Sequence, residues 1–148
     1  MTNYERTKAW LIACGKEPSP ENVSLQIGCQ LEEICEFLGT LRTDSDGYAK
    51  LLDRTRTDLD WFAGKLKRRE QAVYIPPHLR VDALDALCDI EVTGNGVAFF
   101  AGFDKDAADQ AVIDSNDSKL EDGKAVILPG GKIGKGKDYK APDLKGFV

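Results

Sequence analysis

Leu31-Glu32-Glu33-Ile34-Cys35-Glu36-Phe37-Leu38 is the stretch that decides the fold, because it combines three carboxylates with apolar residues at helical spacing. Glu36 lies four residues after Glu32 and three after Glu33, so each of these two like-charged pairs costs roughly 3 kcal/mol at ~5 Å and a dielectric constant of ~20 before salt screening. They form either a solvated acidic face or a site that uses the charge. The apolar positions predict one buried helical stripe, made of Ile27, Leu31, Ile34, Cys35, Leu38 and Leu41.

A second acidic row lies further along the chain. Asp82, Asp85 and Asp89 follow one another at the spacing of one helical face, and Leu84, Leu87 and Cys88 form an adjacent apolar face. If the two predicted helices pack through their apolar faces, the two rows of carboxylates meet. Such a meeting is unfavourable unless a hard cation with oxygen ligands lies between them, and Mg²⁺ or Mn²⁺ suits carboxylate donors.

Capping residues and turns divide the rest of the chain into further helices. The predicted segments begin at Thr2 or Asn3 and stop at Gly15; begin at Ser19-Pro20 and run to about Leu41; cover Tyr48 to about Ala72; run from the Asp82 row to Gly102; and extend from Asp104 to about Leu120. The first convincing strand residues are Ala125–Leu128. The predicted fold is therefore an all-α bundle of four to five helices in a single domain, residues 1–148, with an irregular Gly- and Lys-rich tail over about 121–148.

Glycines interrupt both acidic helices. Gly28 and Gly39 lie in the first, and Gly94 and Gly96 lie in the second. Glycine weakens a helix, and its presence predicts a close approach of another backbone at each position.

The bulk properties exclude several classes of function. A net charge of −5 argues against a general nucleic-acid binder. No apolar run reaches the ~20 residues that span a bilayer, and the N-terminus has no signal-peptide core, so we expect a cytoplasmic protein without a membrane partner. The four cysteines form no CxxC motif and predict buried free thiols in a reducing compartment.

The two acidic rows together resemble the signatures of the all-α nucleotide pyrophosphohydrolases. This superfamily includes MazG-like proteins, dimeric dUTPases and phosphoribosyl-ATP pyrophosphohydrolase. Its first signature, EExxE, is matched by Glu32-Glu33-Ile34-Cys35-Glu36. Its second, ExxD followed by apolar residues and a glycine, is matched in part by Asp89-Ile90-Glu91-Val92-Thr93-Gly94. The glutamate of that signature is replaced by Ala86, and Asp85, one residue earlier, is the nearest carboxylate.

A third resemblance lies near the C-terminus. Ser115-Asn116-Asp117-Ser118-Lys119 matches an S-N-x-S-K segment, and the family has a tail like Gly131-Lys132-Ile133-Gly134-Lys135-Gly136. All three features in this order are fairly specific. They cover the chain from about residue 32 to residue 148, with a variable middle.

The resemblance implies hydrolysis of a nucleoside triphosphate to the monophosphate and pyrophosphate, with Mg²⁺ required and Mn²⁺ as a substitute. It implies a metal held by Glu33, Glu36 and Asp89, with Glu32 and Asp85 as further ligands or in the second shell. Either Glu32 or Glu36 would accept the proton of the attacking water.

Substrate contacts follow from the same resemblance. Asn116 would hydrogen-bond a phosphate or sugar oxygen, and Lys119, Lys124 and Lys135 would offset the charge of the leaving pyrophosphate. A solvated lysine-rich tail is the competing interpretation of these lysines.

Two other functions remain open at this point. Within the same chemistry, the substrate would be phosphoribosyl-ATP. In another class, the chain would be a non-catalytic helical module that binds a nucleotide or a partner, having lost the site with Ala86. The resemblance further implies a homodimer or a dimer of dimers.

Overall fold

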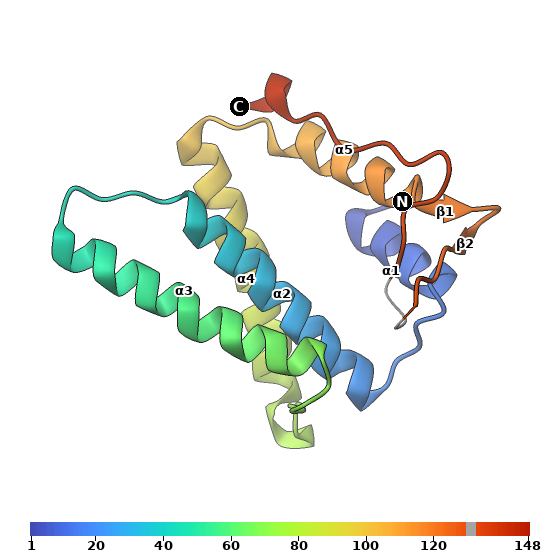
Figure 1. Cartoon of the computed structure of the whole chain (residues 1–148), viewed down its shortest axis with the longest axis horizontal. Coiled ribbons are helices and arrows are strands. Elements are labelled where there is room, and N and C mark those ends of the chain that lie inside the picture. The colour runs from blue at the N-terminus through green and yellow to red at the C-terminus, as the bar shows by residue number, and fades with distance from the viewer. Residues whose placement is uncertain (130–132) are drawn as a thin grey trace. The chain divides into compact units, whose positions relative to one another are not determined.

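The computed structural model describes residues 1–129 and 133–148; Gly130, Gly131 and Lys132 of the predicted tail lie outside the described residues. The chain forms two compact units, Pro18–Pro76 and Met1–Glu17 with Pro77–Val148. Within the described ranges the structure has five α-helices and one two-stranded sheet (Figure 1), which confirms the predicted all-α class. None of these described helices is both long and apolar enough to cross a bilayer.

The unit Pro18–Pro76 is a helical hairpin. Helix α2, Pro20–Thr40, begins as predicted: Ser19 is the N-cap, its side chain accepts a hydrogen bond from the backbone N–H of Asn22, and Pro20 is the first helical residue. Helix α3, Asp46–Lys67, returns alongside α2 (Figure 1). The short connection of a few residues makes the two helices antiparallel neighbours.

Gly28 is the point of closest approach in this hairpin. A Cβ atom at this position would lie 2.9 Å from the Cβ of Leu66 and 3.0 Å from the carbonyl oxygen of Ala63. Leu66 and Ala63 are each 1% exposed. The predicted close packing at Gly28 is therefore confirmed, whereas Gly39 has only ordinary contacts with the side chain of Arg56.

The apolar stripe of α2 is less buried in this hairpin than predicted. Cys35 is buried, and its thiol donates a hydrogen bond to the carbonyl oxygen of Arg56. Burial raises the pKa of that thiol. Leu41 is 39% exposed because α2 ends at Thr40, and the remaining members of the stripe are half-buried: Ile27, Leu31, Ile34 and Leu38.

The end of α3 was predicted too late. The helix stops at Lys67, not near Ala72, because Arg69 adopts a left-handed backbone conformation with φ of 57°. The following segment turns back onto α2, where the backbone N–H of Val73 donates to the buried hydroxyl of Ser24. This hydrogen bond to Ser24 holds the segment after Lys67 against α2 in a non-helical conformation.

The second unit contains α1, Asn3–Ala13; η1, Pro77–Leu79; α4, Arg80–Ala101; and α5, Lys105–Asp117. It continues with strands β1, Leu120–Glu121, and β2, Lys124–Ala125, and ends with η2, Lys145–Phe147. Local chemistry sets the helix ends, as predicted: Thr2 forms a capping box with Glu5, and the side chain of Asp104 caps α5. Helices α1 and α5 lie side by side (Figure 1). The predicted strand Ala125–Leu128 is shorter than expected, with a single bridge between Ile127 and Ile133 beyond β2.

Helix α4 differs most from the prediction. Leu84 is 64% exposed and Leu87 is 48% exposed, and Cys88, predicted to be a buried thiol, is exposed. A Cβ atom at Gly94 or Gly96 would meet nothing within 4 Å. The prediction of close packing at these two glycines was wrong for the described chain, because apolar residues surround the whole helix and the pattern does not specify a covered face.

Candidate functional site

The three glutamates of α2 occupy neighbouring positions around the helix. Glu32 is half-buried at the border of the α3 contact, and Glu33 and Glu36 are exposed. Residues 28, 32 and 35 point toward α3 by helical periodicity, so the row turns from the packed side of the helix to its open side. The packing that holds Gly28 and Cys35 against α3 therefore positions the acidic row.

Glu32 has a basic partner that the sequence did not reveal. The ammonium of Lys67, the last residue of α3, contacts Oε2 of Glu32, and the two side chains are 33% and 40% exposed. This pair links the two helices of the hairpin. No sequence signal singled out Lys67, because its partner lies 35 residues away and the pairing depends on how α2 and α3 pack.

The aspartates of the second row lie on α4, in the other unit. Asp82, Asp85 and Asp89 are exposed, as is Ala86. The backbone carbonyl of Asp89 accepts a hydrogen bond of 2.7 Å from the hydroxyl of Thr93. The row keeps the helical spacing expected for it, with Asp85 one residue before the position that lacks a carboxylate.

The predicted metal ligands are thus divided between the two units. Glu33 and Glu36 belong to one, and Asp85 and Asp89 to the other. No three His, Cys, Asp or Glu residues within 1–129 and 133–148 are grouped so that they would hold a metal ion. The chemistry of the α2 row fits Mg²⁺, because carboxylate oxygens are the donors this ion prefers. The four-residue ligand set itself stays a prediction.

Asn116 and Lys119 form a cluster with Trp10 at the end of α5. The ammonium of Lys119 donates a 2.8 Å hydrogen bond to Oδ1 of Asn116 and lies 5.9 Å from the centre of the Trp10 ring. The indole N–H of Trp10 donates a 2.9 Å hydrogen bond to the carbonyl oxygen of Asn116. In the described parts of the chain Lys119 forms no ion pair with a carboxylate, so its charge is positioned but not neutralised.

Acidic neighbours on α5 are neutralised separately. The guanidinium of Arg6 pairs with both Asp114 and Asp117. The hydrogen bond from Arg6, and then one from Gln110, lower the pKa of Asp114. Because Arg6 compensates these aspartates, they oppose the positive charge of Lys119 less than the sequence implies.

The C-terminal segment brings Lys135 to the same corner. The backbone N–H of Gly136 donates to the carbonyl oxygen of Lys119, and a Cβ atom at residue 136 would lie 2.9 Å from that oxygen. The ammonium of Lys135 lies 4.5 Å from the centre of the Tyr139 ring. The backbone of the segment after residue 133 is therefore held against α5 and the β-hairpin, while the side chain of Lys135 is exposed.

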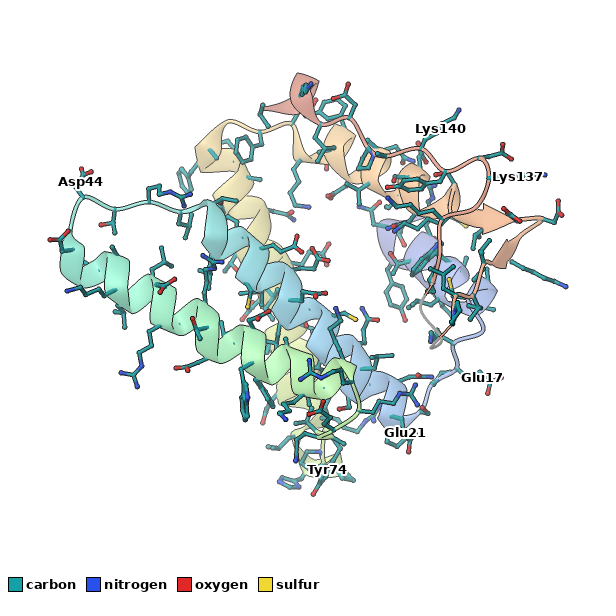
Figure 2. All side chains as sticks on the ribbon, in the orientation of Figure 1. Glu17, Glu21, Asp44, Tyr74, Lys137 and Lys140 are labelled. Atoms are coloured by element: carbon teal, nitrogen blue, oxygen red, sulfur yellow. The ribbon has the colours of Figure 1, made fainter. Side chains whose placement is uncertain are left out.

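Lys124 is placed differently from the other three predicted substrate residues. It lies exposed on β2 opposite Glu121, whose carboxylate accepts a hydrogen bond from the backbone N–H of Lys137. Figure 2 shows Lys137 and Lys140 on the C-terminal segment with their side chains pointing outward. The structure thus brings Asn116 and Lys119 together and places the backbone next to Lys135 against Lys119, and it leaves Lys124 at the tip of the hairpin.

Comparison of the chain with protein-family models, with curated proteins and with solved structures gave no match.

Proposed function

We propose that the chain is a Mg²⁺-dependent nucleoside triphosphate pyrophosphohydrolase, which releases the nucleoside monophosphate and pyrophosphate. One observation carries the proposal in the structure: Lys119 is held by a neutral amide and an aromatic ring, with no carboxylate partner in the described residues. A positioned, uncompensated ammonium favours an anionic ligand such as a phosphate group. The sequence signatures on α2 and α4 support the same reaction.

In this proposal the carboxylates of Glu33 and Glu36 bind the cation. Asp85 and Asp89 are ligands only as the resemblance implies, with Asp85 in place of the carboxylate that Ala86 lacks. When bound, Mg²⁺ supplies charge neutralisation at the α-phosphate and acidifies a bound water. Glu32 or Glu36 accepts the proton of the attacking water.

The leaving pyrophosphate is bound by the second unit. Lys119 and Lys135 neutralise its charge, Lys124 adds a third ammonium, and Asn116 keeps Lys119 oriented. The neutral Asn116 amide holds the lysine without competing with the substrate for its charge.

The partner assembly is part of the proposal. Helix α4 exposes large apolar residues, among them Val81, Leu84, Phe99 and Phe100. Exposed apolar surface of this kind favours association, so we expect a homodimer or a dimer of dimers, to be tested by sedimentation. The location would be the cytoplasm, where the four cysteines, which form no disulfide in the described residues, stay reduced.

A product-resolved assay tests the reaction. The pure protein is incubated with each standard and non-standard (d)NTP and with phosphoribosyl-ATP in the presence of Mg²⁺. Pyrophosphate and a nucleoside monophosphate are the expected products; orthophosphate, or no product from any substrate, would refute the proposal. Turnover of phosphoribosyl-ATP alone would identify that substrate within the same chemistry.

Glu36→Gln is the variant that tests the α2 row. We expect turnover to fall by at least about a hundredfold, because a ligand or proton acceptor is lost while the shape of the side chain is kept. Glu21→Gln, at the start of the same helix, is the matched control and should retain activity within about twofold. Activity that survives in Glu36→Gln would show that the assignment of this residue is wrong.

A non-catalytic binding module is the second candidate, and Ala86 favours it. The side chain of Ala86 is exposed on α4 where the signature requires a carboxylate. If the protein is inert, Ala86→Glu should restore turnover to a decayed site. Calorimetry that shows binding of neither Mg²⁺ nor nucleotide would instead indicate a pure interaction role.

A further inference from the structure

A pocket of about 180 Å³ lies at the end of the hairpin where α2 leads into α3. Figure 2 marks this connection with Asp44. An apolar cavity of about 150 Å³ is large enough to hold a benzene ring, so this pocket has room for one ring or one branched aliphatic group. Apolar side chains from both sides of the hairpin line it: Leu38, Leu41, Ala49 and Leu52.

Two guanidinium groups also line this pocket. Arg42, in the connection, donates from Nη1 to the carbonyl oxygen of Gly39 at 2.8 Å and to that of Leu41 at 2.6 Å. A Cβ atom at Gly39 would lie 3.5 Å from Cζ and 3.6 Å from Nε of Arg56, which belongs to α3. The two guanidinium groups therefore approach the same residue of α2 from different parts of the chain.

The charges of the pocket are only partly balanced. Within residues 1–129 and 133–148 neither Arg42 nor Arg56 forms an ion pair with a carboxylate. The partners of Arg42 are neutral carbonyls, and its Nε and Nη2 atoms carry further donors. Asp53 also lines the pocket, so two positive charges and one negative charge leave a net charge of +1 on these three side chains. A singly charged anion matches this balance.

We propose that this pocket binds a small monocarboxylate whose apolar part is one ring or one branched chain. The apolar part packs against the leucines, and the carboxylate accepts hydrogen bonds from Arg42 and Arg56, whose planar forks suit its two oxygens. A phosphate monoester with two negative charges would be repelled more strongly by Asp53. The pocket lies wholly within Pro18–Pro76 and shares no residue with the proposed metal and phosphate sites, so this ligand is separate from the nucleotide substrate.

Titration of the full chain with benzoate, followed by the NMR shifts of backbone amides, tests the pocket. We expect saturable shifts at Thr43 and Asp53, on the two sides of the pocket. Benzamide has the same shape without the charge, and acetate has the charge without the ring. Each should bind at least about fivefold more weakly than benzoate. Phenyl phosphate should bind no more tightly than benzoate.

Variants separate the guanidinium groups from the net charge of the protein. Arg42→Met and Arg56→Met should each weaken benzoate binding about three- to tenfold, and the use of both covers the case in which one does not fold. Asp53→Asn should strengthen it about threefold. Arg54→Met is the matched control, because Arg54 lies on the same helix, pairs with Asp58 at 3.8 Å and does not line the pocket. Its benzoate affinity should stay within about twofold of the parent.

Four results would overturn the proposal. Benzoate that shifts no amide within residues 38–56 would refute the site. Equal affinities for benzoate and benzamide would show that the guanidinium groups bind no carboxylate. Equal losses in Arg54→Met and Arg56→Met would reduce the effect to net charge. Tighter binding of phenyl phosphate than of benzoate would show that the pocket selects a phosphate and not a carboxylate.

Discussion

Gly28→Ala tests the helix contact on which the α2 row depends. The added Cβ would lie 2.9 Å from the Cβ of Leu66 and 3.0 Å from the carbonyl oxygen of Ala63. Both residues are 1% exposed, and both of the contacted atoms are fixed to the α3 backbone, so relief requires the two helices to move apart. Overpacking of this kind costs about 2–3 kcal/mol, and alanine recovers about 1 kcal/mol over glycine within a helix. We expect the free energy of unfolding to fall by about 1–2 kcal/mol.

Gly39→Ala is the control for this prediction, since it makes the same chemical change on the same helix. Its Cβ would lie 3.5 Å from the Cζ of Arg56, which is ordinary contact with a flexible side chain. Helix propensity then dominates, and the variant should be more stable than the parent by about 0.5–1 kcal/mol. Urea unfolding followed by far-UV circular dichroism measures both. If Gly28→Ala is stabilised as much as Gly39→Ala, the two helices do not meet at Gly28 and the argument fails.

Two further predictions concern exposed side chains. Native alkylation followed by mass spectrometry should modify the exposed Cys88 before Cys14, which is buried and whose pKa is raised by that burial; equal labelling would contradict this. Hydrogen bonds from Arg68, and then from Lys65, lower the pKa of Glu70 from 4.5 to about 2, so its ionised form stabilises the fold above pH 4.5 and that contribution is lost as the pH falls toward 2. The unfolding midpoints of the parent and Glu70→Gln should therefore differ at neutral pH and converge in acid, and a constant difference would refute this reading.

The helix starts could be predicted from the sequence, because they depend on neighbouring residues. Thr2, Ser19 and Asp104 cap their helices as expected, because each bond joins a side chain to a backbone N–H three residues away. The end of α3 was not predictable in this way. It depends on the left-handed Arg69 and on a hydrogen bond to Ser24, which is distant in sequence.

Two glycines and two cysteines show that residues in similar local sequence can have different surroundings in the fold. Gly28 and Gly94 both interrupt an acidic helix, but the first lies against Leu66 and the second meets nothing within 4 Å. Cys35 and Cys88 both follow apolar residues, and only Cys35 is buried. Sequence spacing identifies which residues share a face of a helix, but the neighbours that cover that face come from elsewhere in the fold.

The contact between Lys67 and Glu32 reduces the net negative charge of the α2 row. Repulsion among Glu32, Glu33 and Glu36 is one reason why the sequence predicts a cation beside this row. Lys67 already offsets one of the three negative charges through its contact with Glu32. The acidic helix is thus stabilised in part by its own hairpin, through the contact between Glu32 and Lys67.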